Sequence, residues 1–157
     1  MATLENAIEI AAQAHAGTKD KQGSPYILHP LRVMMGVEGE AAQIVAVLHD
    51  VVEDTNVTLE DVRQAGFSKE VVEALALVTH RPSESYCDYV IGCKGNSIAR
   101  QVKLSDLRDN SNISRMLLRP ERFDSDAARI QRYVLSYRFL TDAIEEDQYR
   151  QAVAKYE

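Results

Sequence analysis

Apolar residues recur at intervals of three and four along almost the whole chain, and this spacing constrains its fold most strongly. Residues three and four apart share one face of an α-helix, so each such segment predicts a helix that buries one stripe. The two-residue alternation of a half-buried strand does not appear convincingly. The β-branched pairs Val51-Val52 and Val71-Val72 lie inside longer helical patterns. The sequence therefore predicts an all-α fold.

Capping residues and helix breakers set the expected boundaries. Thr3, Ser68 and Asn96 are side chains that favour helix N-termini, and Pro30 fits the first turn of a short helix. A capping box opens at Thr58, with Asp in place of the preferred Glu or Gln. The expected helices are residues 4–16, 31–35, 40–53, 58–66, 69–79, 84–94, 97–109, 126–144 and 148–156.

Size and charge exclude several classes of protein. A chain of 157 residues suggests one domain. Its formal net charge of -6 disfavours non-specific nucleic-acid binding, which depends on attraction to phosphates. No apolar run approaches the ~20 residues of a membrane span, and the N-terminal residues do not resemble a signal peptide. We therefore expect neither nucleic acid nor membrane as a partner.

Two cysteines bear on the compartment. Cys87 and Cys93 are six residues apart on an expected helix, so they do not face each other well. Unpaired thiols suggest a reducing compartment, and we expect a cytoplasmic protein. Nearby, Tyr86, Tyr89 and Ile91 fit either a core or an interface. The sequence leaves a homo-oligomer open.

The segment 46–55, Ala-Val-Leu-His-Asp-Val-Val-Glu-Asp-Thr, holds the most informative polar cluster. On a helix, His49 lies four residues before Glu53, and Asp50 lies three and four residues before Glu53 and Asp54. These spacings place the four side chains on a shared surface. Acids at a helix C-terminus are unfavourable to the helix dipole, so the cluster favours a bound cation, most simply a divalent metal.

Two more residues are candidate partners for that pair. His29 precedes Pro30, and Asp106 lies among apolar residues where an unpaired carboxylate would be costly to bury. One hypothesis joins both to the His-Asp pair in one metal site, suited to Mn²⁺, Fe²⁺ or Zn²⁺. The alternative makes each histidine structural and pairs Asp106 with Arg108 or Lys103 at the surface.

Four segments in this order resemble a known family. They are His15-Ala16-Gly17, the Gly-Ser-Pro-Tyr-Ile-Leu-His-Pro run at 23–30, the His-Asp-Val-Val-Glu-Asp-Thr run at 49–55, and Val-Lys-Leu-Ser-Asp at 102–106 followed by Asn110. The chain resembles HD-superfamily metal-dependent phosphohydrolases, and more narrowly the small single-domain form of the RelA/SpoT hydrolase domain. The resemblance implies a compact HD-domain helical bundle of roughly eight helices, forming one domain over residues 1–157.

The resemblance also implies roles for the clustered residues. The positions that match the family's metal ligands, usually for Mn²⁺, are His29, His49, Asp50 and Asp106. Glu53 and Asp54 match its catalytic acidic pair, which positions and deprotonates the attacking water. The alternative for the pair is a solvated helix end.

Four further residues are candidate substrate contacts, and three of them have a simpler structural alternative. Lys21 matches a family position that grips the nucleotide. Lys103 is able to reach a phosphate or to stay a solvated lysine. Asn110 matches a nucleotide-contacting asparagine or simply ends a helix, and Tyr133 fits either the nucleotide pocket or the core.

The sequence differs from the family at positions where the family binds its substrate. Thr18 and Asp20 stand where the family has glutamine and arginine, and Leu107 also replaces an arginine. An acid cannot stack on a base as a guanidinium does. The resemblance thus implies a phosphohydrolase of a nucleotide-like phosphoester, with guanosine 3′,5′-bis(diphosphate) as first candidate for 3′-pyrophosphate removal. The alternatives are another phosphorylated metabolite, or a non-catalytic nucleotide-binding module, against which the Glu53-Asp54 pair argues.

Overall fold

The computed structural model describes residues 1–157 and is built entirely from helices and loops. Its elements are α1 (Leu4–Ala14), α2 (Leu28–Met35), α3 (Glu40–Asp54), α4 (Leu59–Gln64), α5 (Lys69–Val78), α6 (Tyr86–Lys94), α7 (Ser97–Asn110), the 3-10 turn η1 (Pro120–Arg122), α8 (Phe123–Leu140) and α9 (Glu146–Val153). The expected all-α bundle is confirmed. Of its nine α-helices, eight have eight residues or more, and α4 is shorter. None of the helices combines the length and apolar character needed to cross a membrane.

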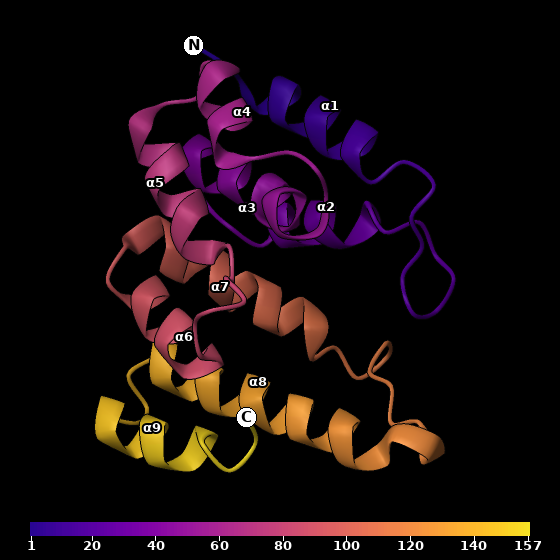
Figure 1. Ribbon diagram of the computed structural model, residues 1–157, viewed down its shortest axis with the longest axis vertical. Helices are drawn as coiled ribbons and strands as arrows, with labels where there is room; N and C mark the ends of the chain where they lie inside the picture. Colours follow the sequence, from indigo (N-terminus) through magenta and orange to yellow (C-terminus); the bar gives the residue numbers. More distant parts are fainter.

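Helix α3 lies at the centre of the upper part of the molecule (Figure 1). Its residues from Ile44 to His49 are all buried, so it is covered on every side rather than along one stripe. Helices α1, α2, α5 and α7 pack around it. A helix that is apolar on all sides is stable only inside such a shell. The consequence is that its polar C-terminal turn emerges from the middle of the fold.

Helix α7 joins two parts of the bundle, one formed by α1 to α5 and the other by α6, α8 and α9. It packs on α2, α3 and α5 on one side and on α6 and α8 on the other (Figure 1). The buried apolar residues form a single core that reaches into the last two helices, where the rings of Phe139 and Tyr149 stack with centroids 4.6 Å apart. Asp106 on α7 therefore lies between the two parts.

Two predicted helices had wrong boundaries. Helix α2 begins at Leu28, not at residue 31, so His29 belongs to its first turn. Helix α8 covers Phe123–Leu140 instead of 126–144. It ends because Asp142 adopts a left-handed φ of 61°, which a helix cannot continue, while Lys94 and Arg100 bind its carboxylate at 2.9 and 2.6 Å. The other ends shift by a few residues.

The aromatic residues of α6 belong to the core. Tyr89 is buried, and its hydroxyl donates to the carbonyl of Val78 at 2.9 Å. Tyr86 and Ile91 are half-buried and pack against the same core. The two cysteines on this helix are free, as the sequence predicted, and both are buried.

Replacing Leu75 with alanine tests how the core is packed. This side chain of α5 is 0% exposed, so Leu75→Ala leaves a cavity and lowers the free energy of unfolding by about 2–5 kcal/mol. The matched control Leu118→Ala removes the same atoms from a side chain that is 52% exposed, and should change it by less than about 0.5 kcal/mol. Urea denaturation measures both, and equal losses would contradict the described core.

Candidate metal and active site

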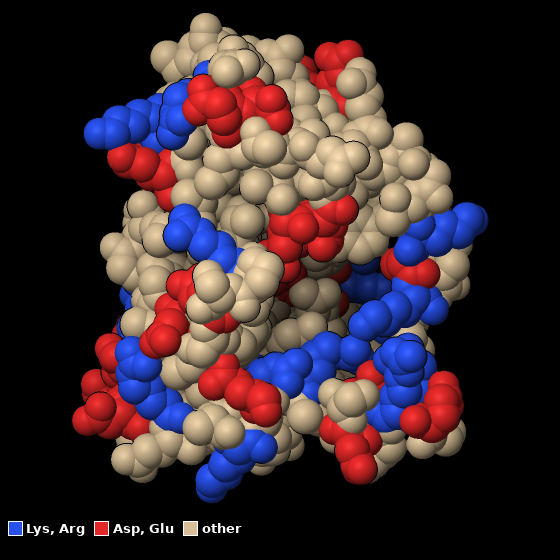
Figure 2. All heavy atoms as spheres, viewed as in Figure 1, with Lys and Arg blue, Asp and Glu red and all other residues tan.

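One cavity of about 1210 Å³ opens between the two parts of the bundle. Figure 2 shows it as a hollow with acidic side chains along its upper edge and basic side chains along its lower edge. Its volume exceeds the ~300–1,000 Å³ usual for small-molecule sites, so a nucleotide fits. All ten residues predicted for the site line it, namely Lys21, His29, His49, Asp50, Glu53, Asp54, Lys103, Asp106, Asn110 and Tyr133.

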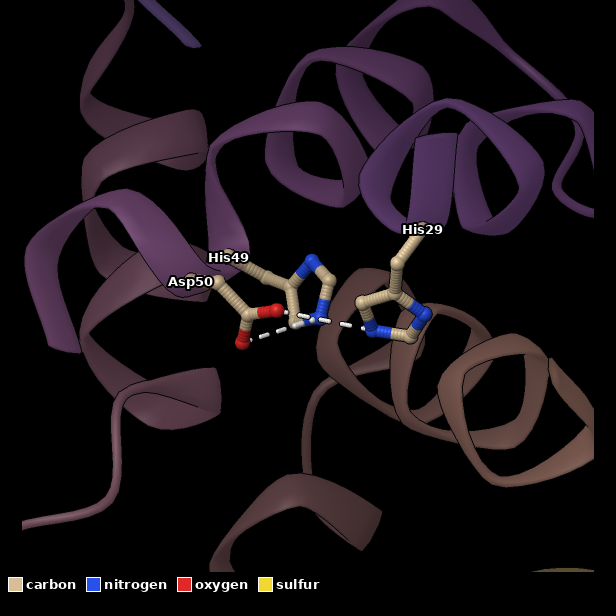
Figure 3. A group of neighbouring side chains, drawn as sticks. All are labelled: His29, His49 and Asp50. Atoms are coloured by element: carbon tan, nitrogen blue, oxygen red, sulfur yellow. Dashed lines mark ion pairs between the residues drawn. The ribbon is translucent and has the colours of Figure 1, made fainter. Parts of the chain in front are cut away.

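Three of these residues converge on one point (Figure 3). His29 comes from the first turn of α2, and His49 and Asp50 come from α3. The carboxylate of Asp50 lies 3.4 Å from Nε2 of His29 and 3.1 Å from Nε2 of His49. One ligand atom of each residue lies within 4.8 Å of the other two. This His-His-Asp cluster is able to hold a divalent metal ion.

Asp106 approaches the same point from α7. Its Oδ1 lies 3.2 Å from Nε2 of His29 and 3.6 Å from Nε2 of His49, and the residue is only 6% exposed. It stands outside the tightest cluster, which contains the other three residues alone. The structure thus brings the four predicted ligands together, with Asp106 at the edge.

The surroundings of Nε2 of His49 show whether a metal fits. Its Nδ1 bonds the carbonyl of Ala46 at 2.7 Å, which leaves Nε2 facing the carboxylates. That Nε2 is buried and has no hydrogen-bond partner, an arrangement that costs free energy unless something binds there. Imidazole and carboxylate groups are ligands of divalent transition metals. The residues present therefore fit the metal that the sequence predicted.

The local field favours positive charge. Burial opposes the charged form of His29, but hydrogen bonds to Asp106 and Asp109, together with the charge of Asp50, outweigh it and raise its pKa to about 10. The pKa of buried His49 is raised in the same way by Asp50 and Asp106. A group of carboxylates that stabilises protonated imidazoles will also stabilise a metal cation in their place.

Lys103 is buried, which excludes the expected alternative of a solvated lysine. It is 7% exposed, and its Nζ lies 2.8 Å from Oδ2 of Asp106 and 4.9 Å from the ring centre of Tyr89. Burial disfavours its charge, yet Asp106 raises its pKa well above the usual value. Asp106 therefore pairs with Lys103, while the exposed Arg108 contacts Tyr137 instead. Contact of Lys103 with a phosphate stays a prediction.

Glu53 and Asp54 occupy the last turn of α3 and face the cavity. Oε2 of Glu53 accepts the backbone N–H of His80 at 2.9 Å, which fixes the position of that carboxylate. Asp54 lies 3.5 Å from the hydroxyl of Tyr26, which donates to Asp50 at 2.6 Å. Burial, reinforced by the charge of Asp50, raises the pKa of both acids. A raised pKa makes a carboxylate a better proton acceptor.

The remaining predicted residues lie around the rim. Asn110 donates to Oδ1 of Asp106 at 2.7 Å, and half-buried Tyr133 packs on the core while lining the cavity. Lys21 has no ion-pair partner, and burial together with nearby Arg129 lowers its pKa. An unpaired cation disfavoured by its surroundings is well placed to bind an anion.

The loop between α1 and α2 explains the departure at Asp20. Oδ1 of Asp20 accepts the backbone N–H groups of Gln22 and Ser24, each at 2.9 Å. The side chain therefore shapes its own loop, in the manner typical of aspartate in turns. It supplies no cation to the cavity that it borders.

Sequence reasoning missed two residues that hold the site in place. Asp109 accepts a hydrogen bond from Nδ1 of His29 at 2.7 Å, and Tyr26 donates to Asp50. Both had a signal in the sequence. Asp109 follows Asp106 by three residues, which places it on the same helix face, and Tyr26 precedes His29 by three.

A family model and several known proteins are similar to this chain. Residues 7–118 match the HD domain. A guanosine-3′,5′-bis(diphosphate) 3′-pyrophosphohydrolase of Aquifex aeolicus is 32% identical over 120 residues, which are 68% of this chain and 17% of that protein. Its namesake in Borreliella burgdorferi is 39% identical over 81 residues, 49% of this chain and 12% of that protein. The chain thus spans a small part of these relatives.

A solved structure shares the fold. It is described as a metazoan ortholog of SpoT that hydrolyses ppGpp, and it superposes with a TM-score of 0.65 at 22% identity, over 99% of this chain and 94% of the other. The helices, the converging His-Asp cluster and the match over residues 7–118 lead to one conclusion. This chain belongs to the HD-domain family.

Proposed function

We propose that this protein is a metal-dependent phosphohydrolase acting on a nucleotide-like phosphoester, with guanosine 3′,5′-bis(diphosphate) as its first candidate substrate. The supporting observation is the buried Nε2 of His49, which has no hydrogen-bond partner and faces His29 and two carboxylates inside a cavity wide enough for a nucleotide. The proposal treats residues 1–157 as one domain, because α8 and α9 contribute to the same core.

The proposed ligands of the metal are His29, His49, Asp50 and Asp106. A divalent ion held there would lower the pKa of a water molecule toward ~7 and offset negative charge on phosphoryl oxygens. We propose Mn²⁺ as that ion, because mixed carboxylate and imidazole ligands suit a hard or borderline cation.

Glu53 and Asp54 handle the proton in this proposal. Glu53 accepts a proton from the attacking water, and the backbone N–H of His80 holds its carboxylate in place while it does so. Asp54 lies beside it on the same helical turn and keeps the local field negative, which favours proton uptake. Hydrolysis then transfers the water oxygen to phosphorus and breaks the ester bond, and the leaving oxygen takes up a proton.

The opposite edge of the cavity would hold the rest of the substrate. Lys21 is the cation without a partner, and Asn110 and Tyr133 border the same space. Lys103, held against Asp106, is the nearest buried cation to the proposed metal. We assign these four residues to substrate contact, with Lys21 and Lys103 binding phosphate groups.

One observation favours a second candidate substrate class. The RelA/SpoT hydrolases that the chain resembles carry an arginine that binds guanine, whereas Asp20 at that position is tied into its own loop. A phosphorylated metabolite other than guanosine 3′,5′-bis(diphosphate) therefore remains a second candidate for the same chemistry.

The free thiols of Cys87 and Cys93 support a reducing compartment, and we propose the cytoplasm.

Removing Asp50 tests the metal site. Wild-type protein stripped with a chelator should bind one Mn²⁺ per chain in isothermal titration calorimetry, and Asp50→Ala should weaken binding at least about tenfold, because it removes a charged ligand. Asp147→Ala deletes an exposed carboxylate of α9 and serves as the matched control. Equal affinity of wild type and Asp50→Ala would rule out the assigned metal site.

Replacing Glu53 with glutamine tests the proton acceptor. Glu53→Gln keeps the shape of the side chain but not its basicity, so kcat should fall about 10²–10⁴-fold while Mn²⁺ still binds. The assay measures phosphate and pyrophosphate released from a panel of nucleotides that includes guanosine 3′,5′-bis(diphosphate).

The control is Glu70→Gln, the same change at an exposed position of α5. A Glu53→Gln enzyme with the wild-type rate would contradict the role of Glu53. If metal-loaded wild-type protein releases nothing from any phosphorylated compound, the phosphohydrolase proposal fails and a non-catalytic binding module takes its place.

A further inference from the structure

Asp109 accepts more hydrogen bonds than any other carboxylate that lines the cavity. It lies near the end of α7, and its side chain is 11% exposed. Its Oδ2 accepts from Nδ1 of His29 at 2.7 Å and from Nη2 of Arg32 at 3.1 Å. Its Oδ1 accepts from Nε of Arg32 at 2.8 Å and from Arg115. Two arginines therefore fix this carboxylate against one histidine.

The contact determines how His29 faces the metal site. Nδ1 points at Asp109, and Nε2 points at Asp50 and Asp106, at 3.4 and 3.2 Å. An ionised carboxylate only accepts hydrogen bonds, so Nδ1 must carry a proton. A neutral imidazole then has its lone pair on Nε2, the nitrogen that faces the ligands. His49 reaches the same state through the carbonyl of Ala46.

We propose that Asp109 is a positioning residue for the metal, which keeps the proton of His29 on Nδ1 and so leaves Nε2 free to bind a divalent cation. The proposal deepens the function proposed above and rests on its metal site. Carboxylates that accept the second N–H of a ligating histidine orient the ring and raise its basicity, and their loss costs about 10–100-fold in metal affinity.

Because of the two arginines, replacing one carboxylate oxygen of Asp109 with an amide nitrogen would reverse the hydrogen bond to His29. Arg32 and Arg115 are donors only, so an asparagine at position 109 would turn its carbonyl oxygen toward them. Its amide nitrogen would then take the place of Oδ2 and donate to Nδ1 of His29. That hydrogen bond moves the ring proton to Nε2 and blocks the metal-binding nitrogen, although the shape of the side chain is unchanged.

Metal affinity in Asp109→Asn is the first test. Competition with a chelator should show Mn²⁺ binding weakened about 10–100-fold in Asp109→Asn and also in Asp109→Ala, with unchanged circular dichroism. Asp124→Asn makes the same charge change at an exposed position in the first turn of α8 and should bind Mn²⁺ like wild type. Affinity of Asp109→Asn equal to that of the Asp124→Asn control would overturn the proposal.

A second measurement uses the wild-type protein and needs no substitution. In wild-type protein labelled with ¹⁵N-histidine and loaded with diamagnetic Zn²⁺, NMR should show His29 protonated on Nδ1 and unprotonated on Nε2. A proton on Nε2 would overturn the positioning role and would remove His29 from the proposed ligands, whereas Zn²⁺ held by the other three residues would keep the rest of the proposed site. If wild-type protein binds neither Mn²⁺ nor Zn²⁺, the proposed function and the role of Asp109 fail together.

Discussion

The buried carboxylate of Asp106 is the constraint on which the arrangement of the site depends. Burial of an acid among apolar residues is costly unless opposite charge compensates it. Here burial would raise the pKa of Asp106, but Lys103, His29 and His49 together hold it well below its usual range. These partners come from α2, α3 and α7, so the charge can be compensated only where the three helices meet. The same convergence brings the Nε2 atoms of His29 and His49 to the carboxylates and so produces the proposed metal centre.

Much of the fold could be predicted because the residues that form and cap most helices lie within those helices or directly before them. The apolar spacing and the caps at Ser68 and Asn96 predicted their helices well, and both caps bond the backbone as expected. The end of α8 could not be predicted, because it depends on Lys94 and Arg100, which are distant in sequence and hold Asp142 in a left-handed conformation. Local pattern gives no information about such partners.

The candidate site, like the fold, could be predicted from the sequence only in part. The spacing of His49, Asp50, Glu53 and Asp54 on one helix made their common surface predictable, and ordered segments added His29 and Asp106. Spacing did not predict that Lys103 is buried, because an isolated lysine is usually solvated and its burial depends on Asp106 and the tyrosines of α6. The role of Asp109 depends on how α2 packs against α7, which brings Arg32 and His29 to it.

The metal centre is tested most directly by anomalous X-ray diffraction from crystals grown with Mn²⁺. We predict one strong peak per chain, about 2.0–2.3 Å from Nε2 of His29, Nε2 of His49 and carboxylate oxygens of Asp50 and Asp106. Such a peak would place the ion beside Glu53 and Asp54, within the cavity proposed to take the substrate. The absence of a peak among these four residues in metal-saturated crystals, or a peak bound elsewhere, would contradict the proposed centre.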